Sequence, residues 1–162
     1  MTQTLDLPQT KAMPNRINTI RYGCGGGVYK ILSTPATSDG QHFSIEATEP
    51  PGGGPPLHVH RTEDEFFYVI EGEITFAVGG RVLKRRAGGS VFVPRGVPHC
   101  FKNTSDEQAK LLVLFTPGDI EGFFEYGAPL PDGSMPSEEL MMQRLNELGP
   151  KYNLEVVGPS PL

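Results

Sequence analysis

Turn-forming residues interrupt this chain at short intervals, and that spacing limits the folds open to it. Glycine (20 residues) and proline (16) together make up more than a fifth of the 162 residues. The turn clusters are Gly23–Gly27, Ser38–Gly40, Pro50–Pro56, Gly79–Gly80 and Pro94–Pro98. Many short strands joined by tight turns fit this pattern better than a bundle of helices. We therefore expect an all-β fold in one compact domain, with strands between Thr19 and Phe115.

Three segments show the strand pattern most clearly. In Gln41–Glu49 the apolar residues alternate with polar ones, as in a strand with one buried face. The segment 73–85 is a hairpin candidate with two glycines at its tip, where a positive φ is least unfavourable for glycine. Ala109–Phe115 is apolar enough to be a central strand. These segments would form the body of a barrel at residues 19–117.

The two ends of the chain differ from this central part. Residues 1–18 are polar, contain two prolines, and are expected to form an extended arm. Residues 118–162 are expected to form a short helical extension that packs on the barrel. Asp119 could cap a first helix that ends at Gly127, and Ser137 could cap a second that ends at Gly149. Both helices have an apolar stripe that would face the barrel.

Charge and cysteine content exclude several kinds of partner. The formal charge is −5, from 19 acidic and 14 basic residues. The densest basic stretch, Arg81–Arg86, alternates with apolar positions as the solvated face of a hairpin would, so nucleic acid is not expected as a partner. Cys24 and Cys100 lack the spacing of a disulfide framework or a zinc finger. No segment resembles a signal peptide or a membrane span, so we expect a cytoplasmic protein that does not bind membranes.

Three of the four histidines, together with one glutamate, form a candidate metal site. His58 and His60 are two residues apart, so on a strand both rings project from the same face. Glu65 follows a polar turn that would bring its carboxylate back toward them, and the turn at Pro94 would direct His99 into the same interior. Three imidazoles and a carboxylate can bind one divalent transition metal and leave open positions. Iron, manganese, nickel, cobalt and zinc all accept this set of ligands.

The arrangement of these residues resembles the two motifs of the cupin family. The first motif is matched by Gly52, His58, His60, Glu65 and Gly72. The second is matched by Gly88, Pro94, Gly96, His99 and Asn103. The resemblance implies a jelly-roll β-barrel that holds a metal at His58, His60, Glu65 and His99. Within the family, the sequence around Glu65 and the C-terminal tail are most similar to single-domain quercetinase-like proteins.

That resemblance implies a dioxygenase that cleaves a flavonol or a similar enolisable compound with O2, with Glu65 also acting as the catalytic base. Two alternatives remain open: another cupin enzyme, such as one that converts oxalate, and a metal-containing barrel that binds or senses a small molecule without turnover.

Apolar side chains near the motifs are candidates for a substrate pocket inside the barrel. These are Phe43, Phe67, Val69, Phe76, Phe92 and Phe101. On the opposite face of the strand that carries Glu65 lie Phe66, Tyr68 and Ile70, and a partner subunit or the N-terminal arm would cover them, which favours a homodimer. We expect Glu63 and Asp64 to belong to a solvated turn, and Cys100 to be a packing residue.

Overall fold

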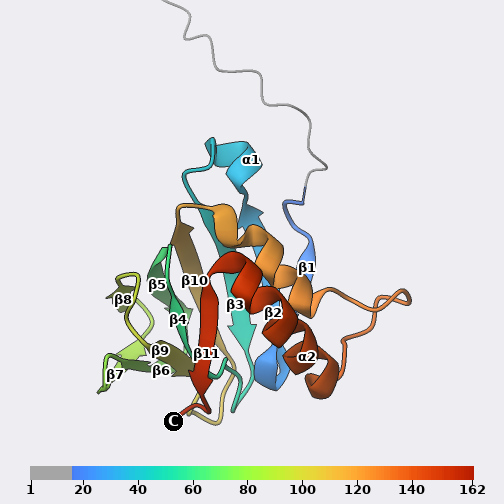
Figure 1. The fold of residues 1–162 in the computed structure, drawn as a ribbon. Coiled ribbons are helices and arrows are strands. Elements are labelled where there is room, and N and C mark those ends of the chain that lie inside the picture. The colour runs from blue at the N-terminus through green and yellow to red at the C-terminus, as the bar shows by residue number, and fades with distance from the viewer. Residues whose placement is uncertain (1–15) are drawn as a thin grey trace, which may run out of the picture.

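The computed structural model describes residues 16–162 and consists mainly of two antiparallel sheets (Figure 1). The first sheet contains β1 (Ile20–Gly23), β2 (Gly27–Ser33), β3 (Phe43–Glu49), β10 (Ala109–Thr116), β5 (Asp64–Glu71) and β8 (Ser90–Val93), in that order. The second contains β11 (Leu154–Gly158), β4 (Leu57–His60), β9 (His99–Lys102), β6 (Glu73–Val78) and β7 (Arg81–Arg86). The chain passes repeatedly from one sheet to the other, and this mostly-β architecture confirms the fold class expected from the sequence.

Alternation along the strands places the core between the two sheets. On β10 every second residue is buried, beginning with Ala109 and ending with Phe115, and the register pairs this strand with β3 on one side and β5 on the other. The predicted hairpin forms between β6 and β7, with Gly79 and Gly80 at its tip in the left-handed region. The inner faces of β3, β5 and β10 contribute many of the buried apolar residues of the core.

One glycine is required by a close approach of two chain segments before β4. Gly54 has φ +149°, and a Cβ atom at this position would overlap the backbone carbonyl of Phe101 on β9. Any larger residue would therefore push the start of β4 away from β9. That pair of strands carries three of the four candidate metal ligands: His58 and His60 lie on β4, and His99 lies on β9 opposite His58.

The C-terminal part of the chain packs against the first sheet and then rejoins the second. The 3-10 helix η2 (Asp119–Gly127) and helix α2 (Glu138–Leu148) contact one another, and η2 also contacts β1 and β3 (Figure 1). Ser137 caps α2 as expected, its side chain accepting a hydrogen bond from the backbone N–H of Leu140 at 3.2 Å. The expected cap at Asp119 is wrong: Gly118 precedes η2 and no side chain caps it.

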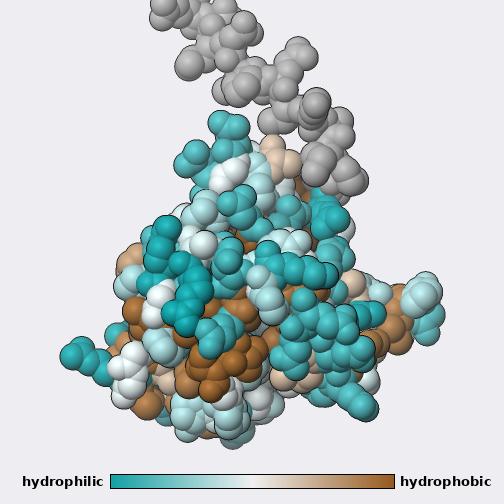
Figure 2. Space-filling model, viewed as in Figure 1, coloured by the Kyte–Doolittle hydropathy of each residue, from teal (hydrophilic) through white to brown (hydrophobic). Residues whose placement is uncertain are grey.

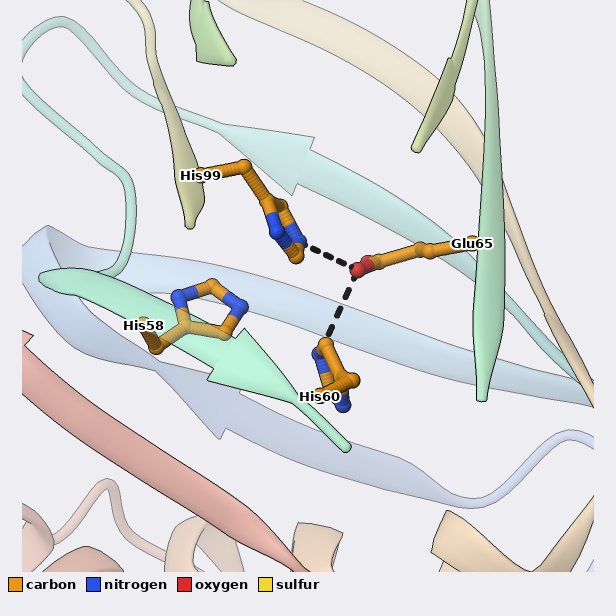
Figure 3. A group of neighbouring side chains, drawn as sticks. All are labelled: His58, His60, Glu65 and His99. Atoms are coloured by element: carbon orange, nitrogen blue, oxygen red, sulfur yellow. Dashed lines mark hydrogen bonds and ion pairs between the residues drawn. The ribbon is translucent and has the colours of Figure 1, made fainter. Parts of the chain in front are cut away.

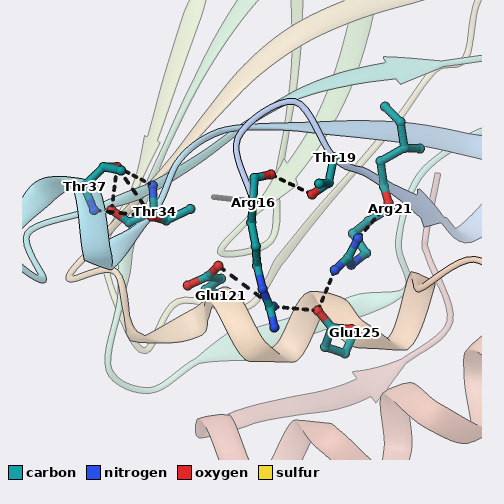
Figure 4. Close-up of polar contacts among 8 residues, drawn as sticks. Arg16, Thr19, Arg21, Thr34, Thr37, Glu121 and Glu125 are labelled. Atoms are coloured by element: carbon teal, nitrogen blue, oxygen red, sulfur yellow. Dashed lines mark hydrogen bonds and ion pairs between the residues drawn. The ribbon is translucent and has the colours of Figure 1, made fainter. Parts of the chain in front are cut away.

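An ion-pair cluster fastens η2 to the first strand. Arg16 Nη1 and Arg21 Nη2 lie 2.8 Å and 2.7 Å from the same carboxylate oxygen of Glu125 (Figure 4). The remaining short elements are η1 (Cys24–Gly26), α1 (Pro35–Ser38) and η3 (Gly149–Tyr152). After η3 the chain forms β11, which pairs with β4 and was not expected from the sequence. The extension is therefore part of the barrel wall as well as a cover for it.

The surface carries one group of exposed apolar residues on the outer face of the first sheet. Tyr68 and Ile70 on β5 are 41% and 38% exposed, and Phe92 on the neighbouring β8 is 58% exposed. The face shown in Figure 2 is mixed, with apolar patches between hydrophilic areas. Within residues 16–162, no helix is long and apolar enough to cross a membrane.

Candidate metal centre

Two neighbouring strands of the second sheet bring the three histidines together. His58 and His60 lie on β4 and both are buried, as expected from their spacing of two. His99 is the first residue of β9 and lies opposite His58. The ring centroids of His58 and His99 are 4.5 Å apart, and those of His60 and His99 are 5.5 Å apart. The structure therefore brings the three rings together in one interior, where the sequence analysis expects them.

Glu65 reaches the histidines from the opposite sheet. It lies on β5, and its Oε2 atom is 2.7 Å from Nε2 of His99 and 3.2 Å from Nε2 of His60 (Figure 3). The carboxylate is buried. We refer to His58, His60, Glu65 and His99 as the His/Glu cluster, since one donor atom from each lies within 4.8 Å of every other.

Backbone carbonyls set the orientation of two of the rings. Nδ1 of His58 lies 2.8 Å from the carbonyl oxygen of Pro56, and Nδ1 of His99 lies 2.9 Å from that of Val97. A carbonyl can only accept, so each Nδ1 carries the hydrogen and donates it. The lone pair of each neutral ring is then on Nε2, where it can bind a metal.

Burial and mutual contact set the charges of the cluster. Burial, assisted by the nearby imidazoles, lowers the pKa of His58 to about 3, so this ring is neutral at pH 7. Burial alone would raise the pKa of Glu65, but His60 and His99 together hold it well below its usual range. The cluster therefore presents an ionised carboxylate beside the imidazoles. The proton between Nε2 of His99 and Oε2 of Glu65 would be replaced by an added divalent cation.

The spacing of the donor atoms fits a single divalent ion. Nitrogen and oxygen ligands lie about 2.0–2.2 Å from a transition metal, so ligands on opposite sides of it are separated by about 4.2 Å. The donors of the cluster all lie within 4.8 Å of one another, and small side-chain rotations would suffice to bring them to that separation. The cluster could thus hold one metal ion, and two positions of an octahedral ion would remain for other ligands.

Glu63 contributes to this site in a way the sequence did not indicate. We expected it in a solvated turn, but its side chain is only 2% exposed. Its Oε1 accepts a hydrogen bond from Thr62 Oγ1 at 2.9 Å, and its Oε2 lies 3.9 Å from Nδ1 of His60. Neither of these last two atoms has a hydrogen-bond partner among residues 16–162. Glu63 is therefore placed to orient the ring of His60 by a small movement.

The neighbouring Asp64 does face solvent, and it connects the two sequence motifs. Its Oδ1 accepts hydrogen bonds from the backbone N–H of Arg95 at 2.9 Å and from Arg95 Nε at 3.1 Å. This contact holds the pKa of Asp64 below its usual value. Arg95 belongs to the turn that leads to His99, so the pair helps to fix the position of that turn relative to β5.

A cavity of about 50 Å³ opens beside the cluster, between the two sheets and the C-terminal extension. Its walls are mainly aromatic and aliphatic: Tyr29, Ile45, Pro55, Pro56, Phe101, Val113, Phe115, Phe123, Phe124, Tyr126, Leu145, Leu154 and Val156, together with His58, His60 and Glu65. Among the described residues, no lysine or arginine lines it. The volume is room for a few water molecules, so a ring system would enter only if wall side chains turn aside.

The expected pocket residues are divided by the structure. Phe101 lines the cavity. Phe43, Phe67, Val69 and Phe76 are buried in the core and are not among the lining residues. The expectation for Phe92 is wrong, because β8 turns Val91 and Val93 inward and leaves Phe92 on the outer surface. The sequence analysis did not predict that residues of the C-terminal extension line this cavity. The apolar stripes of the two expected helices were the feature that could have indicated it.

Comparison with known proteins identifies the family. A family model described as a cupin domain matches residues 45–115, which include the whole His/Glu cluster. Protein SchB of Streptomyces halstedii is 32% identical over 116 residues, covering 70% of this chain and 78% of the relative. A predicted oxalate decarboxylase of Thermotoga maritima has a similar structure, with a TM-score of 0.55 at 27% identity over 65% of this chain and 92% of that chain. The chain belongs to the cupin family.

A more distant relative carries the name expected from the sequence. Quercetin 2,3-dioxygenase of Bacillus subtilis is 26% identical over 138 residues, which is 83% of this chain. The match spans only 41% of that protein. The relatives thus include proteins named for a flavonol and for oxalate, and they share a fold rather than one substrate.

Proposed function

We propose that this protein is a metal-dependent dioxygenase that cleaves an enolisable aromatic compound, such as a flavonol, with O2. The observation that carries the proposal is the position of the His/Glu cluster at one end of an apolar, largely aromatic cavity. The resemblance to quercetin 2,3-dioxygenase supports it. The small-molecule partner would be planar and uncharged or would ionise only on binding, since an apolar wall does not compensate a buried charge.

The lining of the cavity favours this proposal over an oxalate-converting enzyme. Oxalate is a small dianion, and a site for it needs cationic groups or strong hydrogen-bond donors in addition to the metal. Within the described residues, the lining outside the His/Glu cluster consists of aromatic rings, prolines and aliphatic side chains; it includes the neutral side chains of Tyr29 and Tyr126 but no lysine or arginine. The flat rings of Phe101 and Phe115 instead suit stacking against an aromatic ligand.

Each residue of the cluster has a role in the proposed reaction. His58, His60, His99 and Glu65 would hold one divalent ion per chain, which when bound supplies a Lewis acid for the substrate oxygen and a position for O2. Glu65 is ionised and its Oε2 points to the centre of the cluster, so it can accept the proton of the substrate hydroxyl as that oxygen approaches. The surrounding aromatic walls would exclude bulk water.

Oxygen uptake tests the proposal. The protein would be loaded separately with iron, manganese, nickel, cobalt or zinc and mixed with quercetin or with 1,3-cyclohexanedione, a one-ring enolisable compound that needs less room. We expect a metal-dependent rate that is abolished in Glu65→Ala and retained in the control Glu71→Gln, which changes an exposed glutamate on the same strand. Stoichiometric metal without oxygen uptake from either compound would contradict the proposed activity.

Binding without turnover is the second reading of the same site. A metal-containing barrel that only binds or senses its ligand would give a saturable spectral change of the flavonol and no loss of O2. The cytoplasmic location and the homodimer expected from the sequence remain predictions, and the identity of the metal is an outcome of the loading experiment.

A further inference from the structure

Two tyrosines line the cavity in addition to residues of the His/Glu cluster. Tyr29 lies on β2 and Tyr126 near the end of η2, and each is 3% exposed. Their hydroxyls interact with one another, and burial raises the pKa of both well above its usual value. At neutral pH they are therefore uncharged hydroxyls, each able to donate and to accept a hydrogen bond.

Tyr29 lies at a different level of the barrel from Glu65. The register places Tyr29 opposite Ala47, Ala47 opposite Leu111, and Leu111 opposite Val69. Glu65 precedes Val69 by four residues on β5. At about 3.3 Å per residue, the two levels are separated by about 13 Å along the strand direction. Polar residues therefore line the cavity at two separate levels of the barrel.

A buried carboxyl lies behind Tyr29. Glu49 is the last residue of β3, is fully buried, and interacts with Tyr29. Neither of its oxygens has a hydrogen bond within 3.5 Å to any of residues 16–162. Burial raises the pKa of this carboxyl to about 8, so at neutral pH it is mainly protonated. This end of the cavity is thus backed by a further neutral polar group rather than by more apolar core.

We infer that Tyr29 and Tyr126 form a second polar subsite, which binds a hydroxyl or carbonyl oxygen of the ligand whose other end reaches the His/Glu cluster. The inference rests on the proposed function, because it takes that cluster as the metal-binding end. It narrows the substrate class to planar, uncharged ring compounds with oxygen atoms at both ends. A neutral pair of hydroxyls suits a phenol or a ketone better than a carboxylate or phosphate.

Both tyrosines lie outside the segment that matches the family model, residues 45–115. The subsite is therefore a property of this chain's own flanking segments. Tyr126 comes from the same extension as Phe123, Phe124 and Leu145, which also line the small cavity. A ligand long enough to reach both ends would displace these side chains and make contact with the extension.

Binding of two matched ligands tests the subsite without turnover. Quercetin and 3-hydroxyflavone share the oxygen atoms that would approach the metal, but only quercetin carries further hydroxyls at the distant ring positions. Affinities would be measured by calorimetry under anaerobic conditions on zinc-loaded wild type, Tyr29→Phe and Tyr126→Phe. Tyr22→Phe serves as the control, since Tyr22 does not line the cavity and its hydroxyl donates to the Gly133 carbonyl at 3.4 Å.

We expect each cavity variant to lose about tenfold in affinity for quercetin and to bind 3-hydroxyflavone as the wild type does. Circular dichroism would show that the variants remain folded. Equal losses for both ligands would show a structural role for the tyrosines and would overturn the inference, as would wild-type protein that binds neither flavonol. Selective loss of quercetin binding without oxygen uptake would support the subsite and contradict only the proposed activity.

Discussion

Replacing Glu49 with glutamine should change how the stability of the protein depends on pH. The carboxyl of Glu49 is fully buried, packs against Gly27 and Gly53, and lacks a hydrogen bond from any residue in the part of the chain described. Burial raises its pKa from 4.5 to about 8, although the interaction with Tyr29 opposes this. The folded protein therefore keeps a proton over a pH range in which the unfolded chain has released it.

The size of the effect follows from this difference in proton binding. Between about pH 5.5 and pH 7.5 the folded state binds one more proton than the unfolded state at this group, so the free energy of unfolding falls by about 1.4 kcal/mol per pH unit, or about 2.7 kcal/mol in all. The decline ends above the folded pKa of about 8. Glu49→Gln has no such proton, and any penalty for burying its amide does not change with pH.

Urea denaturation at several pH values, followed by circular dichroism, measures this directly. The difference in unfolding free energy, wild type minus Glu49→Gln, should fall by about 2.7 kcal/mol from pH 5.5 to 7.5. Taking the difference removes the contribution of the histidines, which both proteins share. Glu107→Gln, which removes an exposed carboxyl, is the matched control. A difference that stays constant over this range would refute the argument and would mean that water or a hydrogen-bond donor reaches the buried carboxyl.

Three further perturbations test the metal centre and the outer surface. His99→Ala should lose most of the bound metal while the barrel stays folded, as measured by metal analysis and circular dichroism; full metal content would exclude His99 as a ligand. Glu63→Gln should weaken metal binding by about tenfold or more, because the group beside Nδ1 of His60 no longer carries a charge; competition with a chelating dye would measure it, and unchanged affinity would rule out that role. If Tyr68, Ile70 and Phe92 form a homodimer interface, Phe92→Lys should sediment as a monomer. The control Val82→Lys changes an exposed residue on the other sheet and should stay dimeric. A monomeric wild type would exclude the dimer.

The sequence predicted the His/Glu cluster partly from a local rule and partly from the resemblance to the two cupin motifs, which implied Glu65 and His99 as ligands. Residues two apart on a strand share a face, so His58 and His60 required only that this segment be a strand. Glu63 could not be assigned in this way, since the burial of a turn residue depends on what packs over the turn. The strand β11 was missed for a related reason, because its partner β4 is distant in sequence. An ion pair at 2.6 Å between Arg61, which follows β4, and Glu155 on β11 joins the same two segments. Phe92 was wrongly predicted to line the interior, because it alternates on β8 with Val91 and Val93, which are the residues that point inward.

The cavity is lined partly by the segment that matches the family model and partly by segments outside it, and this difference matters for the choice of substrate. The whole cluster lies within the segment that matches the family model, and the relatives of this chain are named for very different compounds. Several of the side chains that line the cavity lie outside that segment, in β2, η2, α2 and β11. A relative's substrate therefore transfers to this chain only if those walls are shared too. Variants of Tyr29 and Tyr126 are consequently more informative about the substrate than any further change to the histidines, which would test the metal alone.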